Sequence, residues 1–203
     1  MKASETAVIF IEFQNDFCSE GGKLHDLVRT EMPRVNTVTN AKRLLDAVRA
    51  KGCTVIHCPF SLDTIWVDHC TICGLIANVR QGNVFEPGTW GHEIITELQP
   101  RTGETVLQNK RALSAFTNTC LDDILKRMNI RNIIVAGFLT NVCAQATAWS
   151  AYDLGYNVRM AIDACCATSR ANHEYVENEV CPILGGRTTV EDLIKAFVTE
   201  LQS

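Results

Sequence analysis

The sequence alternates short apolar runs with longer segments of helical periodicity. Continuous apolar runs are typical of strands buried on both faces, as in a parallel sheet covered by helices. Strands are expected at residues 7–11, 53–57, 105–107, 132–137 and 158–162. Amphipathic helices are expected at residues 35–48, 115–128, 143–154 and 189–201. This alternation predicts a three-layer α/β fold, in which helices flank a mainly parallel sheet.

Composition excludes several classes of protein. With 203 residues, of which 46% are hydrophobic and 21% are charged, the chain has enough apolar material for a globular core. The net charge of −4 argues against general nucleic-acid binding, and no apolar run reaches the roughly 20 residues of a membrane span. We find no linker, repeat or signal-peptide cleavage site, so we expect one domain over residues 1–203 and a cytoplasmic location.

The chain contains ten cysteines, which we interpret as reduced thiols, most of them small buried hydrophobes. A zinc site is the alternative, because Cys70 and Cys73 have CxxC spacing beside His69, and His57 lies upstream. A second ligand pair with recognisable spacing is missing from the sequence. We therefore predict neither a metal nor another cofactor.

Three reactive side chains follow predicted strands. Glu12 ends the first strand, Lys110 follows the third, and Cys143 lies in the turn after the fourth. Ligands in open α/β sheets bind beyond the carboxyl ends of the strands, so these groups can converge at one edge. Each also has a structural interpretation: a strand-end acid or partner of an arginine, a solvated lysine, and a buried structural cysteine.

Cys143 is the sharpest candidate, because it falls in the first turn of a predicted helix. Thr140 or Asn141 is a plausible N-cap. The positive end of the helix dipole and a nearby Lys110 are expected to lower the thiol pKa. Backbone N–H groups of that turn lack helical partners and could bind an oxyanion.

Several segments resemble the isochorismatase-like hydrolases. IEFQNDF at residues 11–17 is similar to their V-I-D-x-Q-N-D-F opening, and KRALSAF at 110–116 matches K-x-x-x-S-A-F. GFLTNVC at 137–143 matches G-x-x-T-N-V-C. Shorter likenesses occur at residues 87–94 and 163–169, so the resemblance covers nearly the whole chain in the expected order.

The resemblance implies a Rossmann-like fold with about six parallel strands and a catalytic triad of Glu12, Lys110 and Cys143. It also implies an oxyanion hole made by the backbone N–H groups of Leu139 and Cys143, and a cis peptide bond between Phe138 and Leu139. Glu12 departs from the family pattern, which has aspartate, and one methylene adds roughly 1.5 Å of reach where near-attack geometry tolerates little displacement.

The predicted function is hydrolysis of a small amide, ureido or carbamoyl compound through a thioester on Cys143. One alternative is the vinyl-ether hydrolysis of true isochorismatases, which needs no thiol. The other is a non-catalytic binding or scaffolding member, whose site Glu12 has altered. Nicotinamidase is disfavoured because its Asp-x-His metal pattern is missing after the second strand.

The substrate pocket and the partners are predicted more coarsely. Phe17, Trp66, His69 and Trp90 lie in loops that should overhang the strand ends, so we expect them to line the pocket. The expected partner is a small-molecule substrate, with neither nucleic acid nor membrane. Related proteins assemble as dimers or larger oligomers, which implies a homo-oligomer here.

Overall fold

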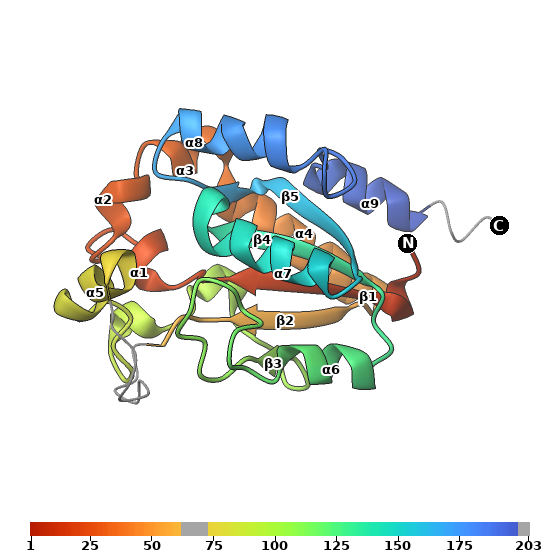
Figure 1. Ribbon diagram of the computed structural model, residues 1–203, viewed down its shortest axis with the longest axis horizontal. Helices are drawn as coiled ribbons and strands as arrows, with labels where there is room; N and C mark the ends of the chain where they lie inside the picture. Colours follow the sequence, from red (N-terminus) through yellow and green to blue (C-terminus); the bar gives the residue numbers. More distant parts are fainter. Residues whose placement is uncertain (62–72, 199–203) are drawn as a thin grey trace.

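The computed structural model describes residues 1–61 and 73–198. Its described part contains one sheet of five parallel strands in the order β3-β2-β1-β4-β5 (Figure 1). The strands are β1 (Thr6–Ile11), β2 (Thr54–Cys58), β3 (Thr105–Val106), β4 (Asn132–Phe138) and β5 (Asn157–Cys166). All five overlap the apolar runs of the sequence, which confirms those predictions.

Helices and short turns connect the strands. The α-helices are α1 (Asn15–Cys18), α2 (His25–Val28), α3 (Glu31–Val35), α4 (Thr37–Lys51), α5 (Gly74–Gln81), α6 (Leu121–Arg127), α7 (Gln145–Asp153), α8 (Arg170–Tyr175) and α9 (Val190–Val198). The 3-10 turns are η1 (Ala3–Glu5), η2 (Trp90–His92) and η3 (Thr96–Leu98), and the π-helical segments are η4 (Thr140–Ala144) and η5 (Val176–Val180). None of the described helices is long and apolar enough to cross a membrane.

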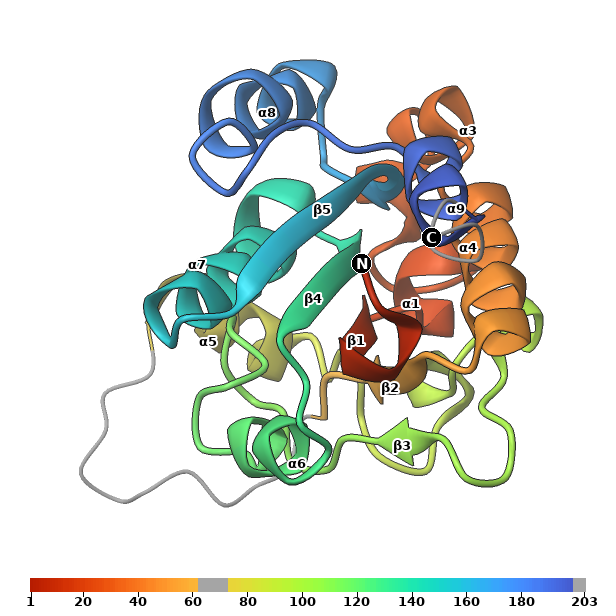
Figure 2. The same cartoon turned by 90° about the vertical axis from the view of Figure 1, so that its right-hand side faces the viewer.

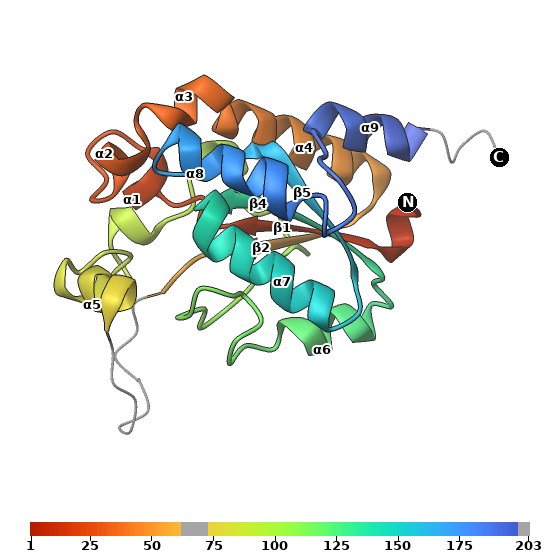
Figure 3. The ribbon, with the colours of Figure 1, turned by 45° about the horizontal axis from the view of Figure 1, so that its top comes forward.

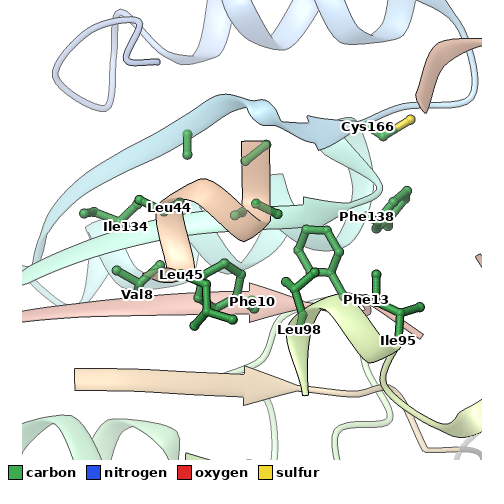
Figure 4. Close-up of a cluster of buried hydrophobic side chains, with 14 of the residues drawn as sticks. Val8, Phe10, Phe13, Leu44, Leu45, Ile95, Leu98, Ile134, Phe138 and Cys166 are labelled. Atoms are coloured by element: carbon green, nitrogen blue, oxygen red, sulfur yellow. The ribbon is translucent and has the colours of Figure 1, made fainter. Parts of the chain in front are cut away.

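The two faces of the sheet are covered by different helices (Figures 2 and 3). Along β1, Val8 and Phe10 join the core beneath α4 and α9, whereas Ala7, Ile9 and Ile11 join the core beneath α6 and α7. Figure 4 shows the first of these clusters, in which Leu44 and Leu45 of α4 pack beside Val8 and Phe10. The period of two along the strand thus places apolar side chains on both faces.

The expected sixth strand is reduced to a single parallel bridge between Ala161 and Thr188 in the described part of the chain. Gly185 and Gly186 precede that bridge with positive φ, and α9 begins soon afterwards at Val190. Little extended backbone is left, so the predicted number of about six strands is too high.

The helix expected over residues 115–128 is also shorter than predicted. Helix α6 begins only at Leu121, because the preceding backbone is used in other contacts. The Ala115 N–H donates to Oγ1 of Thr147 at 3.0 Å, and the Thr119 hydroxyl donates to the Ala115 carbonyl at 2.6 Å. Tertiary contacts therefore override the helical periodicity there.

The strand order reverses on either side of β1, whose neighbours are β2 and β4. A reversal of this kind is where open α/β sheets bind ligands. Helices α1, α2 and α5 lie beyond the carboxyl ends of these strands, at the left of Figure 1. The fold thus indicates a ligand site at the residues that follow β1 and β4.

Candidate active site

Glu12, Lys110 and Cys143 meet at the carboxyl edge of the sheet, and all three are buried, at 2%, 0% and 5% exposure. Lys110 Nζ is ion-paired with Glu12 Oε1, and the Cys143 thiol donates a hydrogen bond to the Glu12 carboxylate. The structure thus brings together an acid, an ammonium and a thiol that lie far apart in the sequence.

Glu12 stands where β1 leaves the sheet. Its φ of 57° is in the left-handed region, and its N–H donates to the Cys58 carbonyl of β2 at 3.1 Å. On the other side of β1, Ile11 is in register with Gly137, whose φ is 131°. A Cβ on Gly137 would collide with the Ile11 backbone, so glycine allows β1 and β4 to approach closely beside the site.

Lys110 belongs to this site and is not a solvated lysine. Its backbone forms a parallel bridge with Phe60, while its Nζ donates to the Ala112 carbonyl at 2.9 Å and lies 5.0 Å from the centroid of the Phe60 ring. Burial would lower the pKa of this ammonium, but the charge of Glu12 and the hydrogen bond to it act in the opposite direction, and the pKa is raised. Lys110 is therefore a fixed cation at neutral pH.

The pKa of Cys143 is raised, so the expected lowering was wrong. Burial is the largest cause, followed by the negative charge of Glu12 and the hydrogen bond to it. Lys110 and the Leu139 backbone act in the opposite direction and are too weak to prevail. Desolvation disfavours the thiolate, and the sequence does not reveal how deeply the thiol is buried.

The turn that carries Cys143 differs from the expected first turn of an α-helix. Cys143 lies in the π-helical segment η4, with Leu139 at its N-cap position and no capping side chain. The Thr140 hydroxyl is instead 3.0 Å from Nδ1 of the buried His173. The predicted caps at Thr140 and Asn141 were therefore wrong, whereas the cis peptide bond between Phe138 and Leu139 is confirmed.

Leu139 contributes its backbone to the site. Its carbonyl accepts from the N–H groups of Val142 at 2.9 Å and Ala144 at 3.2 Å, which fixes the start of the turn. A backbone hydrogen bond from Leu139 also favours the thiolate form of Cys143, and only the N–H of a peptide group can do this. The Leu139 N–H therefore lies near the sulfur.

A narrow pocket with a cavity volume of about 40 Å³ lies against the thiol. Its described lining consists of Glu12, Phe17, Leu24, Leu27, Phe60, Leu75, Ile76, Val79, Phe85, Leu113, Leu139, Val142 and Cys143. Phe17 thus lies where it was expected. Two further predicted pocket residues, Trp66 and His69, lie outside the described residues.

Trp90 does not line this pocket. It lies in η2, its side chain is half exposed, and its carbonyl accepts from Nδ2 of Asn15 at 2.8 Å. The turn therefore serves to anchor the loop after β1. Sequence reasoning missed Phe60 and Phe85, although Phe60 follows the second predicted strand and that position was a usable signal.

Phe85 gave no usable signal, because a tertiary contact places it. Its backbone has a φ of 56°, and its N–H donates to Oδ2 of the buried Asp16 at 2.7 Å. The other carboxylate oxygen of Asp16 accepts from the Lys23 N–H at 3.1 Å. Asp16 thus ties the loop after β1 to the segment that carries Phe85 into the pocket.

A carboxylate and an aromatic ring hold the His57 side chain. Its Nε2 is 2.9 Å from Oε2 of Glu104, and its ring stacks on Phe10. Within residues 1–61 and 73–198, no group of three or more His, Cys, Asp or Glu side chains could hold a metal ion. His69 and Cys70, two members of the alternative zinc site, lie outside those ranges.

Comparison with known proteins places this site in context. The family profile of the Isochorismatase domain matches residues 6–192. The chain is 34% identical to a ureidoacrylate amidohydrolase of Agrobacterium fabrum over 177 residues, covering 81% of this chain and 77% of that protein. A second ureidoacrylate amidohydrolase, from Azorhizobium caulinodans, is 30% identical and covers 95% of this chain and 90% of its own.

Solved structures agree with the sequence comparison. A cysteine hydrolase from Pseudomonas syringae superposes with a TM-score of 0.86 at 26% identity, covering 98% of this chain and 95% of that chain. The sheet and its flanking helices are thus shared over nearly the full length of both proteins.

Proposed function

The chain belongs to the isochorismatase family, and on that premise we propose that it is a cysteine-dependent amidohydrolase. The proposed substrate is a small amide, ureido or carbamoyl compound. Relatives named as amidohydrolases support the reaction class. The single observation that carries the mechanism is the buried arrangement of Glu12 between Lys110 and Cys143, with the thiol facing an apolar pocket.

The resting site holds a neutral thiol beside a carboxylate that can accept its proton. As Sγ of Cys143 bonds to the substrate carbonyl carbon, the thiol proton passes to Glu12, and the carbonyl electrons move onto oxygen. Lys110 stays charged throughout and compensates the negative charge that moves between carboxylate and sulfur. A raised thiol pKa is compatible with this path, because proton transfer and attack take place together.

The oxyanion of the tetrahedral intermediate is proposed to accept hydrogen bonds from the backbone N–H groups of Leu139 and Cys143. The intermediate then expels the nitrogen, which takes the proton from Glu12 and leaves as ammonia or an amine. The remaining thioester is attacked by a water whose proton goes to Glu12. Collapse releases the acid, and the sulfur recovers its proton.

Glu12 performs here the role that aspartate has in the family pattern. Its longer side chain still reaches both partners, because Lys110 and Cys143 each contact its carboxylate. The left-handed backbone at Glu12 is part of the geometry that delivers the carboxylate to this point. This contact pattern favours a working enzyme over a non-catalytic member of the family.

We also propose that residues 1–203 form a single catalytic domain, that the protein is cytoplasmic, and that it self-associates. Sedimentation of the purified chain tests the last of these, since a sedimenting species of monomer mass would contradict it.

The direct test is ammonia release from a panel of small amides and ureido compounds. Wild type is compared with Cys143→Ala and with Cys165→Ala, which removes another buried thiol outside the site. We expect release by wild type and Cys165→Ala, and a loss on the order of 10³-fold or more in Cys143→Ala. Equal release by Cys143→Ala would contradict the mechanism.

A further inference from the structure

We propose that the substrate of this site is an uncharged amide that carries a branched aliphatic or aromatic group. This inference deepens the proposed amidohydrolase function and rests on it. It follows from the chemistry of the pocket walls, which contact the part of the substrate that does not react.

Three aromatic rings form one wall of the pocket. The Phe85 ring centroid lies 5.4 Å from that of Phe17 and 5.6 Å from that of Phe60, and all three residues are buried. Phe17 also stacks on Phe138 at 5.2 Å, with 14° between the ring planes. The wall is therefore packed from behind, so it is a preformed apolar surface beside the thiol.

Aliphatic side chains continue this surface outward. Leu24 and Leu27 come from the region of α2, whereas Ile76 and Val79 come from α5. Both helices lie beyond the carboxyl ends of the strands, at the left of Figures 1 and 3, with α2 above α5. An apolar substituent that extends from the thiol would thus meet apolar walls along its length.

Two leucines mark the mouth of the pocket. Leu27 is 50% exposed and Leu75 is 44% exposed, and both belong to its lining. Exposed leucines are common, but two on separate helices that border one pocket continue its apolar surface to solvent. A bound apolar group would cover both of them, which favours substrates larger than formamide or urea.

The charges of the lining disfavour an anionic substrate. The charged residue of the described lining is Glu12, and its carboxylate would repel a substrate carboxylate. Lys110 lies behind Glu12, where that carboxylate and the Ala112 carbonyl already engage its ammonium. Lys23, which precedes Leu24 in the sequence and is not part of the described lining, donates from Nζ to the Asn83 carbonyl. A substrate carboxylate would thus lose its water without gaining a counter-charge from this lining.

This preference separates the chain from its named relatives. Ureidoacrylate, after which the relatives from Agrobacterium fabrum and Azorhizobium caulinodans are named, is an acid. The proposed substrate shares with it the carbonyl carbon bonded to nitrogen, where the reaction takes place, and differs in the charge of the remaining group.

A pair of isosteric amides tests the inference. In 4-methylpentanamide an isopropyl group stands where succinamate has a carboxylate, so the two differ in charge and polarity at nearly equal size. We expect wild type to hydrolyse 4-methylpentanamide with a kcat/KM about 10-fold to 200-fold above that for succinamate, in the range of pocket discrimination. The same order is expected for 3-phenylpropanamide over 3-ureidoacrylate.

A variant at the mouth of the pocket provides a second test of the substrate preference. Leu27→Arg places a cation at the rim, and we expect it to shift the ratio of the two kcat/KM values toward succinamate by about tenfold or more, the scale of one charge pair. Leu154→Arg is the matched control, because Leu154 is 48% exposed and is not part of this pocket. It should leave the ratio unchanged.

Binding to Cys143→Ala separates the two proposals. Tighter binding of 4-methylpentanamide than of succinamate, without turnover by wild type, would support the substrate class and contradict the amidohydrolase function. Faster hydrolysis of succinamate or 3-ureidoacrylate by wild type would overturn the substrate class and leave the function standing. A shift of the ratio by Leu154→Arg equal to that by Leu27→Arg would also overturn it.

Discussion

Two glutamates of this chain sit in charged clusters: Glu12 is buried, and Glu104 is partly exposed. Glu104 precedes β3 and is saturated with donors: Nε and Nη2 of Arg49 at 2.6 and 2.8 Å, the Arg101 N–H at 2.9 Å, and His57 Nε2 at 2.9 Å. Glu12 follows β1 and accepts from Lys110 and from the thiol of Cys143. One cluster contains a thiol, and the other does not.

The comparison shows that burial and pairing of a carboxylate do not by themselves indicate catalysis. Burial would raise the pKa of Glu104, but hydrogen bonds from Arg49, Arg101 and His57 lower it to about 2, so this acid holds no proton near neutral pH. Burial lowers the pKa of His57, which is therefore uncharged and donates from Nε2. At Glu12 the neighbouring sulfur carries a proton and lies next to a pocket.

The largest contrast is expected from matched amide substitutions. Glu12→Gln removes the proton acceptor, and we expect kcat to fall by about 10²–10⁴-fold, the usual contribution of a general base. Glu104→Gln leaves the proposed site intact and should change kcat by less than about threefold. Ammonia release under saturating amide measures both. Equal losses in the two variants would contradict the assignment of different roles.

Replacing the cation of each cluster should lower the free energy of unfolding by different amounts. Lys110→Met leaves the Glu12 carboxylate buried without its ion pair, so we expect the free energy of unfolding to drop by about 3–5 kcal/mol. Arg49→Met should cost less, about 1–3 kcal/mol, because Glu104 keeps the His57 and Arg101 donors. Urea denaturation gives both values, and a larger loss in Arg49→Met would break the comparison.

Acid should affect the Glu104 cluster in a defined pH window. Since the folded pKa is about 2 and the ordinary value is 4.5, ionised Glu104 stabilises the fold above pH 4.5, and this stabilisation disappears as the pH falls toward 2. The difference in unfolding free energy between wild type and Glu104→Gln should therefore shrink between pH 4.5 and pH 2. Denaturation at a series of pH values measures it, and a constant difference would contradict the charged role of Glu104.

The smallest predicted effect concerns thiol reactivity. Because Glu12 raises the pKa of Cys143 and Lys110 lowers it, Glu12→Gln should speed alkylation of Cys143 near neutral pH by several-fold, even as turnover falls. Lys110→Met should slow it. Peptide mapping distinguishes Cys143 from the exposed Cys73 and Cys120, which serve as internal controls. Slower alkylation in Glu12→Gln would contradict the electrostatic account.

The sequence predicts where the site lies better than how it behaves. Five apolar runs indicate the strands, and their carboxyl ends indicate Glu12, Lys110 and Cys143, because chain order and parallel pairing decide which residues share an edge. The thiol pKa could not be predicted, since it depends on burial by segments far away in the chain. Trp90 illustrates the same limit: its turn anchors the loop after β1, but its side chain is half exposed and does not line the pocket.

Loop-borne pocket residues escape prediction for a related reason. Phe85 reaches the pocket because Asp16 binds its N–H across 69 positions of sequence. Neither Asp16 nor Phe85 belongs to a periodic sequence pattern from which the contact could be predicted. The predicted number of strands was too high for a different reason. The family resemblance implies about six strands, whereas the apolar runs of this chain indicate the five that its described part contains.

The central claim is that Cys143, and not merely a charged cluster at a sheet edge, performs the chemistry. It is tested most directly by acid quenching wild type during turnover of 4-methylpentanamide and 3-phenylpropanamide, followed by mass spectrometry of the peptides. The account predicts an acyl group in thioester linkage on Cys143 and on none of the other cysteines, and it predicts that this group forms about 10²-fold or more slowly in the Glu12→Gln variant. Turnover at the wild-type rate by Cys143→Ala, or an acyl group on another residue that forms and decays at the turnover rate, would contradict it.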